Sequence, residues 1–253
     1  MAELFKTIDL SGKPPALDQF KQGIKMVYAG VTERVKGLLG KHEGIGSTGR
    51  ITRDYRELLF PEQESDDGVI ELLRNKRTVD VGSGVIHSDA EALPSQLTAR
   101  YPNSLYACVE PRLGYEVGHP KGFSPDLQPL DGNLLQVIGD SRAALVAATG
   151  ERLPFADESM DYYLSCYLMP WHFTSPRVIM NFLTELRRVL KVNGEARLGP
   201  LSEENYDLLT KNRRLRQFLH DHFEVQVFTK NNSGNDQMQW VGFDYSLRLL
   251  RKS

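Results

Sequence analysis

A cluster of residue types suited to holding a nucleotide lies between positions 77 and 90, where the chain reads Arg-Thr-Val-Asp-Val-Gly-Ser-Gly-Val-Ile-His-Ser-Asp-Ala. A β-branched run carries Asp80 and ends in Gly82, Ser83 and Gly84. Glycine lets the backbone approach a ligand closely, and the free N–H groups of a following helix favour the ligand's negative end. We predict a strand, a glycine turn and a helix N-terminus, with these four residues binding a cofactor. A chance Gly-Ser-Gly turn is the alternative.

A second acid, Glu110, follows an apolar strand predicted over residues 105–109. In a doubly wound sheet, the end of the second strand lies beside the glycine turn of the first strand. A carboxylate at that point can accept hydrogen bonds from both hydroxyls of a ribose. Glu110 is therefore predicted to bind the same ligand as Asp80, and an exposed loop glutamate is the alternative.

The segment Asp80-Val-Gly-Ser-Gly-Val-Ile86 resembles the first signature of class I S-adenosylmethionine-dependent methyltransferases, Asp/Glu-x-Gly-x-Gly-x-Gly. Ile86 stands where that family has its third glycine. The Gly-x-Gly-x-x-Gly fingerprint of dinucleotide-binding enzymes fits less well, because its third glycine falls on His87. The resemblance implies S-adenosylmethionine as the cofactor and an acid at the position of Glu110.

The segment from Thr149 to Asp161 reads Thr-Gly-Glu-Arg-Leu-Pro-Phe-Ala-Asp-Glu-Ser-Met-Asp. It resembles the Asp-Ala-Glu-x-Leu-Pro-Phe-x-Asp-x-Ser-Phe-Asp passage of the small-molecule methyltransferases called type 11. Thr149 and Gly150 replace Asp-Ala, and Met160 replaces phenylalanine. That family's acid contacts the adenine amine, so the resemblance implies that Thr149, Gly150 and Glu151 lie at the adenine. Backbone groups there can hydrogen-bond the ring edge.

The apolar run 162–168 predicts a central strand buried on both faces. The residues after it, Met169-Pro-Trp-His-Phe173, are expected at the carboxyl edge of the sheet, facing cofactor and substrate. Methyl transfer from a sulfonium requires alignment of the reactants and a base only for a protonated acceptor. Tyr167 and His172 are the candidate catalytic residues, and packing of the neighbouring aromatic side chains into the core is the alternative.

The strands and helices that position these residues follow from the apolar pattern. Parallel strands are expected at residues 78–81, 105–109, 142–149, 162–168 and 196–199. Two antiparallel strands, 223–229 and 240–250, are expected to end the chain. Such a terminal hairpin distinguishes class I methyltransferases from dinucleotide-binding sheets. We predict an α/β, doubly wound, mostly parallel seven-stranded sheet with a terminal antiparallel hairpin, the Rossmann-like methyltransferase fold, preceded by an N-terminal helical extension.

We assign residues 1–66 to this extension and residues 67–253 to the methyltransferase domain. Residues 14–40 carry apolar positions three or four residues apart, which predicts a long amphipathic helix. A second helix is expected from Thr52 to Phe60. The resemblance makes this second helix a candidate lid over the cofactor, with Arg50, Arg53 and Tyr55 facing the ligand; a solvated helix face is the alternative.

The overall composition is ordinary: 253 residues, 40% hydrophobic, 25% charged, with a net charge of −2. Nothing in it favours nucleic acid or an anionic membrane as a partner. The sequence has no pattern of a secretory signal or a spanning helix, so we expect a cytoplasmic protein. His220 and His222 lack further ligands, and we expect no metal site. Cys108 and Cys166 lie in apolar runs and are expected to be buried thiols.

The sequence thus predicts an S-adenosylmethionine-dependent methyltransferase whose acceptor is not specified by the residues. Aromatic residues near the expected mouth of the site, Tyr55, Tyr115 and Trp171, favour a small, partly apolar molecule. A non-catalytic protein of methyltransferase fold is the alternative, supported by Ile86 and Thr149 in place of the family's residues. A nicotinamide-dependent oxidoreductase is the third hypothesis.

Overall fold

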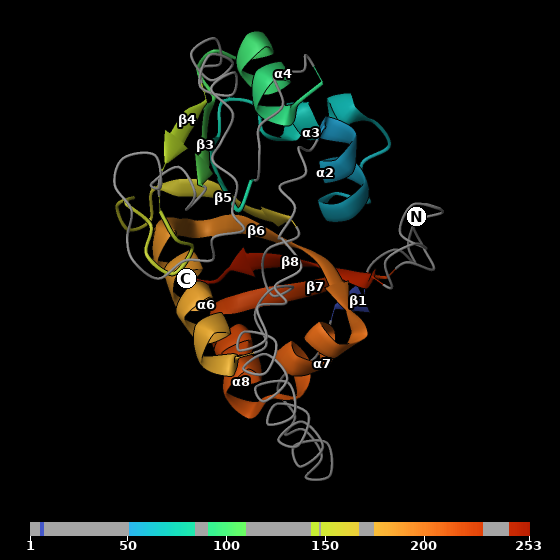
Figure 1. Ribbon diagram of the computed structural model, residues 1–253, viewed down its shortest axis with the longest axis vertical. Helices are drawn as coiled ribbons and strands as arrows, with labels where there is room; N and C mark the ends of the chain where they lie inside the picture. Colours follow the sequence, from blue (N-terminus) through green and yellow to red (C-terminus); the bar gives the residue numbers. More distant parts are fainter. Residues whose placement is uncertain are drawn as a thin grey trace, which may run out of the picture.

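One mixed sheet organises the part of the chain that the computed structural model describes, namely residues 6–7, 51–83, 91–109, 143–146, 148–166, 175–229 and 243–253. Within those residues, eight strands pair in the order β1-β7-β8-β6-β5-β2-β3-β4 (Figure 1). The strands are β1 (Lys6–Thr7), β2 (Arg77–Val81), β3 (Leu105–Val109), β4 (Ala144–Val146), β5 (Met160–Cys166), β6 (Leu190–Ser202), β7 (Phe223–Thr229) and β8 (Phe243–Arg251). The helices are α2 (Thr52–Leu59), α3 (Asp66–Leu72), α4 (Leu93–Arg100), α6 (Pro176–Val189), α7 (Glu203–Lys211) and α8 (Arg213–His222).

The strand directions confirm the predicted fold class. Five strands, β4, β3, β2, β5 and β6, are mutually parallel. The consecutive strands β7 and β8 form an antiparallel pair, and β8 inserts between β7 and β6. The sheet differs from the predicted seven strands by β1, which pairs antiparallel with β7. Two residues are too few to show an alternating pattern in a sequence, so β1 had no signal.

The two faces of the sheet are covered by different helices. After the irregular pairing at Met160, odd-numbered apolar side chains of β2 and β5, such as Val79 and Tyr163, belong to the apolar cluster formed with α6, α7 and α8. Even-numbered ones, such as Leu164 and Cys166, belong to a second cluster formed with α2, α3 and α4. Figure 1 shows these two helix groups on opposite sides of the strands. The alternation is expected for strands buried on both faces.

Polar side chains cap the starts of three described helices, α3, α7 and α8. The Ser65 hydroxyl accepts a hydrogen bond from Gly68 N at the start of α3, and the Ser202 hydroxyl accepts one from Asn205 N at the start of α7. The Asn212 side chain accepts from two backbone N–H groups and begins α8 directly after α7. The predicted domain boundary between residues 66 and 67 falls within the first turn of α3, and the division into two domains stays a prediction. Residues 14–40 lie outside the described part of the chain.

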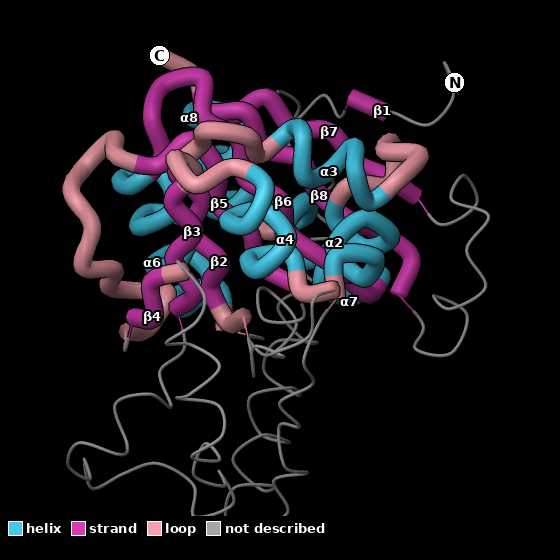
Figure 2. Tube along the Cα trace, turned by 90° about the horizontal axis from the view of Figure 1, so that it is seen from above, coloured by secondary structure: helices cyan, strands magenta, loops and turns pink. Residues whose placement is uncertain are grey.

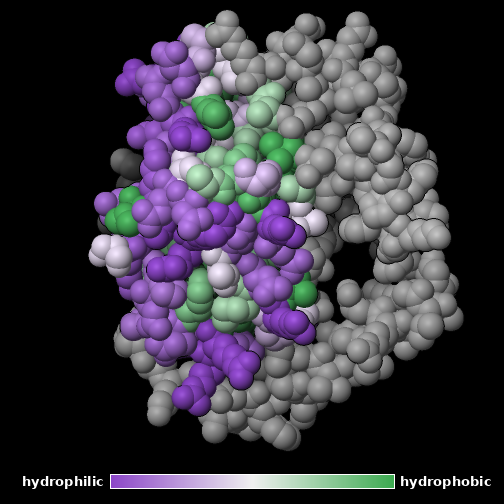
Figure 3. All heavy atoms as spheres, turned by 90° about the vertical axis from the view of Figure 1, so that its left-hand side faces the viewer, coloured by the Kyte–Doolittle hydropathy of each residue, from purple (hydrophilic) through white to green (hydrophobic). Residues whose placement is uncertain are grey.

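Apolar side chains of the described residues are largely buried. Large hydrophobic residues exposed among them are Leu105 and Val192, at 38% and 39%. The face drawn in Figure 3 is mainly hydrophilic over the described residues. The two cysteines, Cys108 and Cys166, are free and buried, as predicted. No helix of the described ranges is long and apolar enough to cross a membrane.

Candidate functional site

The carboxyl ends of β2 and β3 lie side by side, as the sequence predicted. Val81 pairs with Val109 in register, and Gly82 N donates a hydrogen bond of 2.8 Å to Val109 O. Gly82 has a φ of 74°, a conformation that favours glycine. The backbone therefore turns sharply at the end of β2. Val109 is the last described residue of β3, and the predicted ribose-binding residue that follows it in the sequence, Glu110, lies outside the described part of the chain.

The carboxylate of Asp80 is fully buried one residue before the end of β2. Its Oδ2 accepts hydrogen bonds from the hydroxyls of Tyr55, on α2, and Tyr106, on β3; the Tyr106 bond is 2.9 Å long. Burial, and then the charge of Asp80, raise the pKa of Tyr106 well above its usual value. The Tyr106 phenol thus remains a protonated donor at neutral pH. Together, the Tyr55 and Tyr106 hydroxyls bind the carboxylate from two elements.

Sequence reasoning missed Tyr106 as a partner of Asp80. Asp80 pairs with Cys108 in register, so Tyr106 is its diagonal neighbour on the same face of the sheet. That relation could have been inferred once β2 and β3 were predicted to be parallel neighbours. Burial and the nearby Asp80 carboxylate raise the pKa of the Cys108 thiol, which keeps it protonated and unreactive. Ser83, the next predicted cofactor residue, is 5% exposed.

Helix α2 is fixed at both ends. At its start, Thr52 N and Thr52 Oγ1 donate to Glu91 O at 2.9 and 2.8 Å, and Oγ1 lies 3.0 Å from Gln96 Oε1. At its end, Leu59 O accepts a bond of 3.1 Å from the buried guanidinium of Arg197. The helix is therefore attached to the segment leading into α4 and to strand β6, in the middle of the sheet.

The predicted lid residues of this helix separate into two groups. Tyr55 is 2% exposed and points at Asp80. The Arg53 side chain is 52% exposed and forms an ion pair with Glu57 at 3.1 Å. Arg50 lies outside the described residues. Tyr55 is thus an inward-facing residue, whereas Arg53 belongs to the solvated face that was the alternative interpretation.

The segment predicted to lie at the adenine forms a tight turn after β4. Thr149 and Glu151 are exposed, and Thr149 forms an isolated antiparallel bridge with Arg152. Glu151 Oε1 accepts a hydrogen bond of 3.2 Å from Asn181 Nδ2 on α6. Gly150 is buried, and a Cβ there would lie 2.1 Å from Cε1 of Phe182. Gly150 therefore has a packing role beside its predicted one at the cofactor.

We expect Gly150→Ala to lower the free energy of unfolding by about 1–3 kcal/mol, because the methyl group overpacks a filled space. Besides Phe182, the added Cβ would lie 2.8 Å from Val81 Cγ1, at the end of β2. Urea denaturation of the single and double variants tests this. In a Phe182→Leu background, Gly150→Ala should cost less than in the parent. An equal cost in both backgrounds would contradict the packing explanation.

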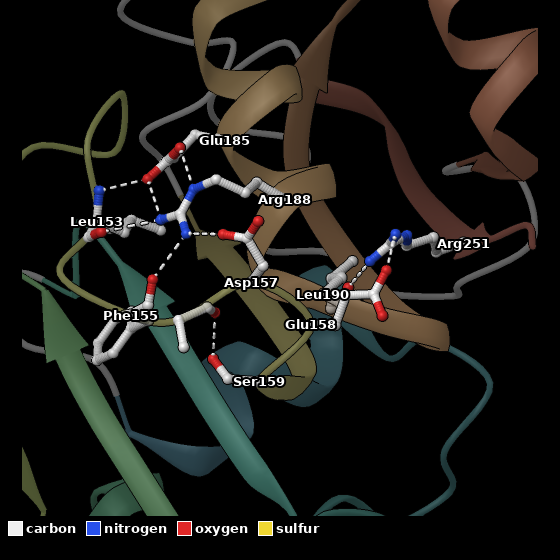
Figure 4. Close-up of polar contacts among 10 residues, drawn as sticks. Leu153, Phe155, Asp157, Glu158, Ser159, Glu185, Arg188, Leu190 and Arg251 are labelled. Carbon is white, nitrogen blue, oxygen red and sulfur yellow. Dashed lines mark hydrogen bonds and ion pairs between the residues drawn. The ribbon is translucent and has the colours of Figure 1, made fainter.

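The Leu-Pro-Phe passage is held by one arginine of α6 (Figure 4). Nη2 of Arg188 donates to Leu153 O at 3.0 Å, and Nη1 donates to Phe155 O at 2.8 Å and to Asp157 Oδ1 at 2.6 Å. Glu185 accepts from Arg188 Nη2 and Nε and also, at 2.6 Å, from Leu153 N. Hydrogen bonds from Arg188 lower the pKa of Glu185, so the carboxylate stays ionised. Residues 153–157 of this motif thus have a structural function.

Several predicted site residues fall outside the described part of the chain: Gly84, Glu110, Tyr167 and His172. Strand β5 ends at Cys166, directly before Tyr167, and its parallel neighbour β2 ends at the same edge of the sheet. Figure 2 shows the strands and the covering helices from above. Among the described residues, no group of His, Cys, Asp and Glu is arranged to hold a metal ion.

Comparison with known proteins connects this architecture to one type of domain. Residues 131–198, which include β4, β5 and α6, match the family of methyltransferase domains. A comparison with curated proteins gives no match.

Solved structures with a similar chain trace include three methyltransferases. A SAM dependent methyltransferase from Aquifex aeolicus is 16% identical, with a TM-score of 0.46, over 78% of this chain and 92% of that chain. The tRNA (m1A58) methyltransferase TrmI of the same organism is 12% identical, with a TM-score of 0.48, over 84% and 73%. A putative sarcosine dimethylglycine methyltransferase from Galdieria sulphuraria is 13% identical, with a TM-score of 0.42, over 75% and 87%.

Proposed function

We propose that the chain is an S-adenosylmethionine-dependent methyltransferase, in keeping with the match of residues 131–198 to a methyltransferase domain, and that it transfers the methyl group of the cofactor to a small-molecule acceptor. The observation that carries this proposal is the edge formed by β2 and β3. There a buried acid and a glycine turn of positive φ lie beside the last residue of β3, Val109. Open α/β sheets bind their ligands outside the carboxyl ends of the strands.

The residues at this edge fit the chemical parts of the cofactor. The turn at Gly82 and Ser83 leaves no Cβ at its first position, so the backbone can approach a ligand there. We assign Asp80, Gly82, Ser83 and Gly84 to the cofactor, and Glu110 to the ribose hydroxyls. We also assign Thr149, Gly150 and Glu151 to the adenine, whose edge would form hydrogen bonds with their backbone groups.

The residues have little bond chemistry to perform. When bound, S-adenosylmethionine supplies a methyl group on a positively charged sulfur: the acceptor's electron pair forms the new bond to the methyl carbon, and the pair of the broken carbon–sulfur bond stays on the sulfur, which becomes a neutral thioether. The protein's main contribution is to hold the acceptor in line with that carbon. His172 or Tyr167, on the segment after β5, takes the proton of an acceptor that must lose one.

The choice of a small acceptor rests on composition. With a net charge of −2, the chain as a whole offers no electrostatic attraction that would favour nucleic acid as the acceptor. The aromatic residues Tyr115 and Trp171 also suit a partly apolar molecule. Incubation with radiolabelled S-adenosylmethionine and fractionated cell extract tests this choice. We expect label in the small-molecule fraction; label confined to RNA or protein would contradict it.

The cofactor site is tested by Glu110→Ala. Calorimetry should give micromolar S-adenosylmethionine binding by the intact protein and at least about tenfold weaker binding by the variant, because two hydrogen bonds to a charged group are lost. Glu224→Ala, which removes an exposed carboxylate on β7, is the matched control and should bind normally.

The outcomes separate the three hypotheses. Absence of S-adenosylmethionine binding by the intact, folded protein would overturn the proposal and favour the non-catalytic protein. Absence of such binding together with enhanced NADH fluorescence would favour the oxidoreductase. Normal binding by Glu110→Ala would show that the ribose contact was assigned to the wrong residue.

A further inference from the structure

Two tyrosines from different elements converge on the acid of the glycine turn. We propose that Tyr55 and Tyr106 are positioning residues, which orient the Asp80 carboxylate for cofactor binding. Helix α2, which carries Tyr55, is consequently a static part of the cofactor site and does not open and close as a lid. The inference rests on the proposed function, because it assumes that S-adenosylmethionine binds at the carboxyl end of β2. The inference adds helix α2 to the elements that form the cofactor site.

The geometry of the three side chains carries the inference. Tyr55, Tyr106 and Asp80 are 2%, 0% and 0% exposed, so water does not compete for their hydrogen bonds. Both hydroxyls donate to the same carboxylate oxygen, Oδ2. Two donors on one oxygen, approaching from a helix and from a neighbouring strand, fix the rotation of the carboxyl group. The plane of the carboxylate is thus set before any ligand arrives.

The position of Asp80 makes that orientation relevant to the cofactor. Asp80 is two residues before Gly82, where the backbone turns. A carboxylate here attracts the positive charges of the cofactor, which are carried by its ammonium and sulfonium groups. Burial strengthens this attraction, because nearby water that would screen it is excluded. A carboxylate that rotated freely would have to become ordered when the cofactor binds, and the conformational entropy lost would weaken the binding.

The placement of Tyr55 is determined by contacts away from Asp80. Thr52 attaches the start of α2 to Glu91, and Arg197 attaches its end through Leu59 O. Tyr55 is therefore held beside Asp80 by a helix that is attached to the rest of the protein both before and after this residue. A helix that opened and closed as a lid would have to break these contacts together with the Tyr55 bond.

Phenylalanine variants test the inference with little change in shape. Tyr55→Phe and Tyr106→Phe should each weaken S-adenosylmethionine binding about fivefold to tenfold in calorimetry, because each removes one hydrogen bond to a charged group. In an Asp80→Asn background, each should change the affinity by less than about twofold, because its effect acts through the carboxylate. This loss of effect is a result that a merely structural role would not produce.

Tyr163→Phe is the matched control. Tyr163 is a fully buried tyrosine on β5, and among the described residues its hydroxyl has no hydrogen-bond partner. It belongs to the apolar cluster on the opposite face of the sheet from Tyr55. We expect Tyr163→Phe to bind the cofactor normally and to be at least as stable as the parent, because no hydrogen bond is lost.

Each outcome has one meaning. If the intact protein binds S-adenosylmethionine and both phenylalanine variants bind equally well, the inference is overturned and the proposed function stands. If the variants weaken binding equally in the parent and in the Asp80→Asn background, the tyrosines act independently of Asp80 and the inference is again overturned. If the intact protein does not bind, the proposed function itself fails. Circular dichroism confirms folding, and if Tyr106→Phe does not fold, Tyr55→Phe decides alone.

Discussion

Replacing Arg197 with methionine is expected to lower the free energy of unfolding by about 3–5 kcal/mol, the largest stability effect that the structure predicts. The guanidinium is 1% exposed and lies on β6, under the end of α2. It donates to Glu62 Oε1 at 2.5 Å and Oε2 at 3.1 Å, and to Glu195 Oε1 at 2.5 Å. Methionine would fill much of the volume but leave these carboxylates without their shared cation.

Aromatic rings add to the cost of losing Arg197. The guanidinium carbon lies 4.8 Å from the ring centroid of Phe60 and 5.4 Å from that of Phe228, within the range of cation–π interactions. Arg248 also binds Glu195, with its Nη2 at 2.6 Å from Oε2, and it retains that contact in the variant. The uncompensated charge would therefore fall mainly on Glu62, whose side chain is 16% exposed.

Chemical denaturation with matched variants measures this effect. Arg53→Ala, which breaks an exposed ion pair of α2, should cost less than about 1 kcal/mol. Adding Glu62→Gln and Glu195→Gln to Arg197→Met should restore part of the stability, because the unpaired charges are removed. A loss below about 1 kcal/mol for Arg197→Met alone would show that this network does not hold α2 on the sheet.

The second large effect is expected for Arg188→Ala, which should cost about 2–4 kcal/mol. The change removes hydrogen bonds to two backbone carbonyls, Leu153 O and Phe155 O, and leaves Glu185 without its cation. The turn that follows Gly150 would then lose its Arg188 attachments to α6 and keep, among the described residues, only the hydrogen bonds from Leu153 N to Glu185 and from Asn181 to Glu151. Because this turn is proposed to lie at the adenine, S-adenosylmethionine affinity should fall together with stability.

Urea denaturation and limited proteolysis test the Arg188 prediction. Cleavage should become faster within residues 151–159, where the attachment is lost. Arg187→Ala, one residue earlier on the same helix, should leave both measurements close to those of the parent, within about 1 kcal/mol. Arg188→Lys should restore little, because an ammonium cannot reproduce the planar set of donors. Unchanged proteolysis in Arg188→Ala would contradict the proposed attachment.

Periodic and local features of the chain were predictable. Strands 105–109 and 223–229 coincide with β3 and β7, because the first is an apolar run and the second alternates apolar and polar residues. The parallel sheet and its antiparallel hairpin followed from the order of such runs. The strand predicted at 196–199 is longer in the structure, where β6 covers Leu190–Ser202. Its first residues include Asn193 and Gly194, which favour a turn, so this part shows no strand pattern in the sequence.

Contacts between distant residues were not predictable. The resemblance of residues 149–161 to a methyltransferase motif indicated a cofactor contact, but Leu153 O, Phe155 O and Asp157 bind Arg188, at sequence separations of 31 to 35. Tyr55 was placed on a candidate lid, and nothing in its own segment indicated that it reaches Asp80. Such contacts depend on how α2 and α6 pack against the sheet, which no local pattern encodes.

A crystal structure with bound S-adenosylhomocysteine tests the central claim most directly. The ligand's adenosyl group should lie against the turn at Gly82 and Ser83, between the carboxyl ends of β2 and β3, with its ribose hydroxyls on the Glu110 carboxylate. A ligand bound elsewhere on the protein would contradict this account. So would strand ends closed off by side chains in crystals soaked at saturating concentration.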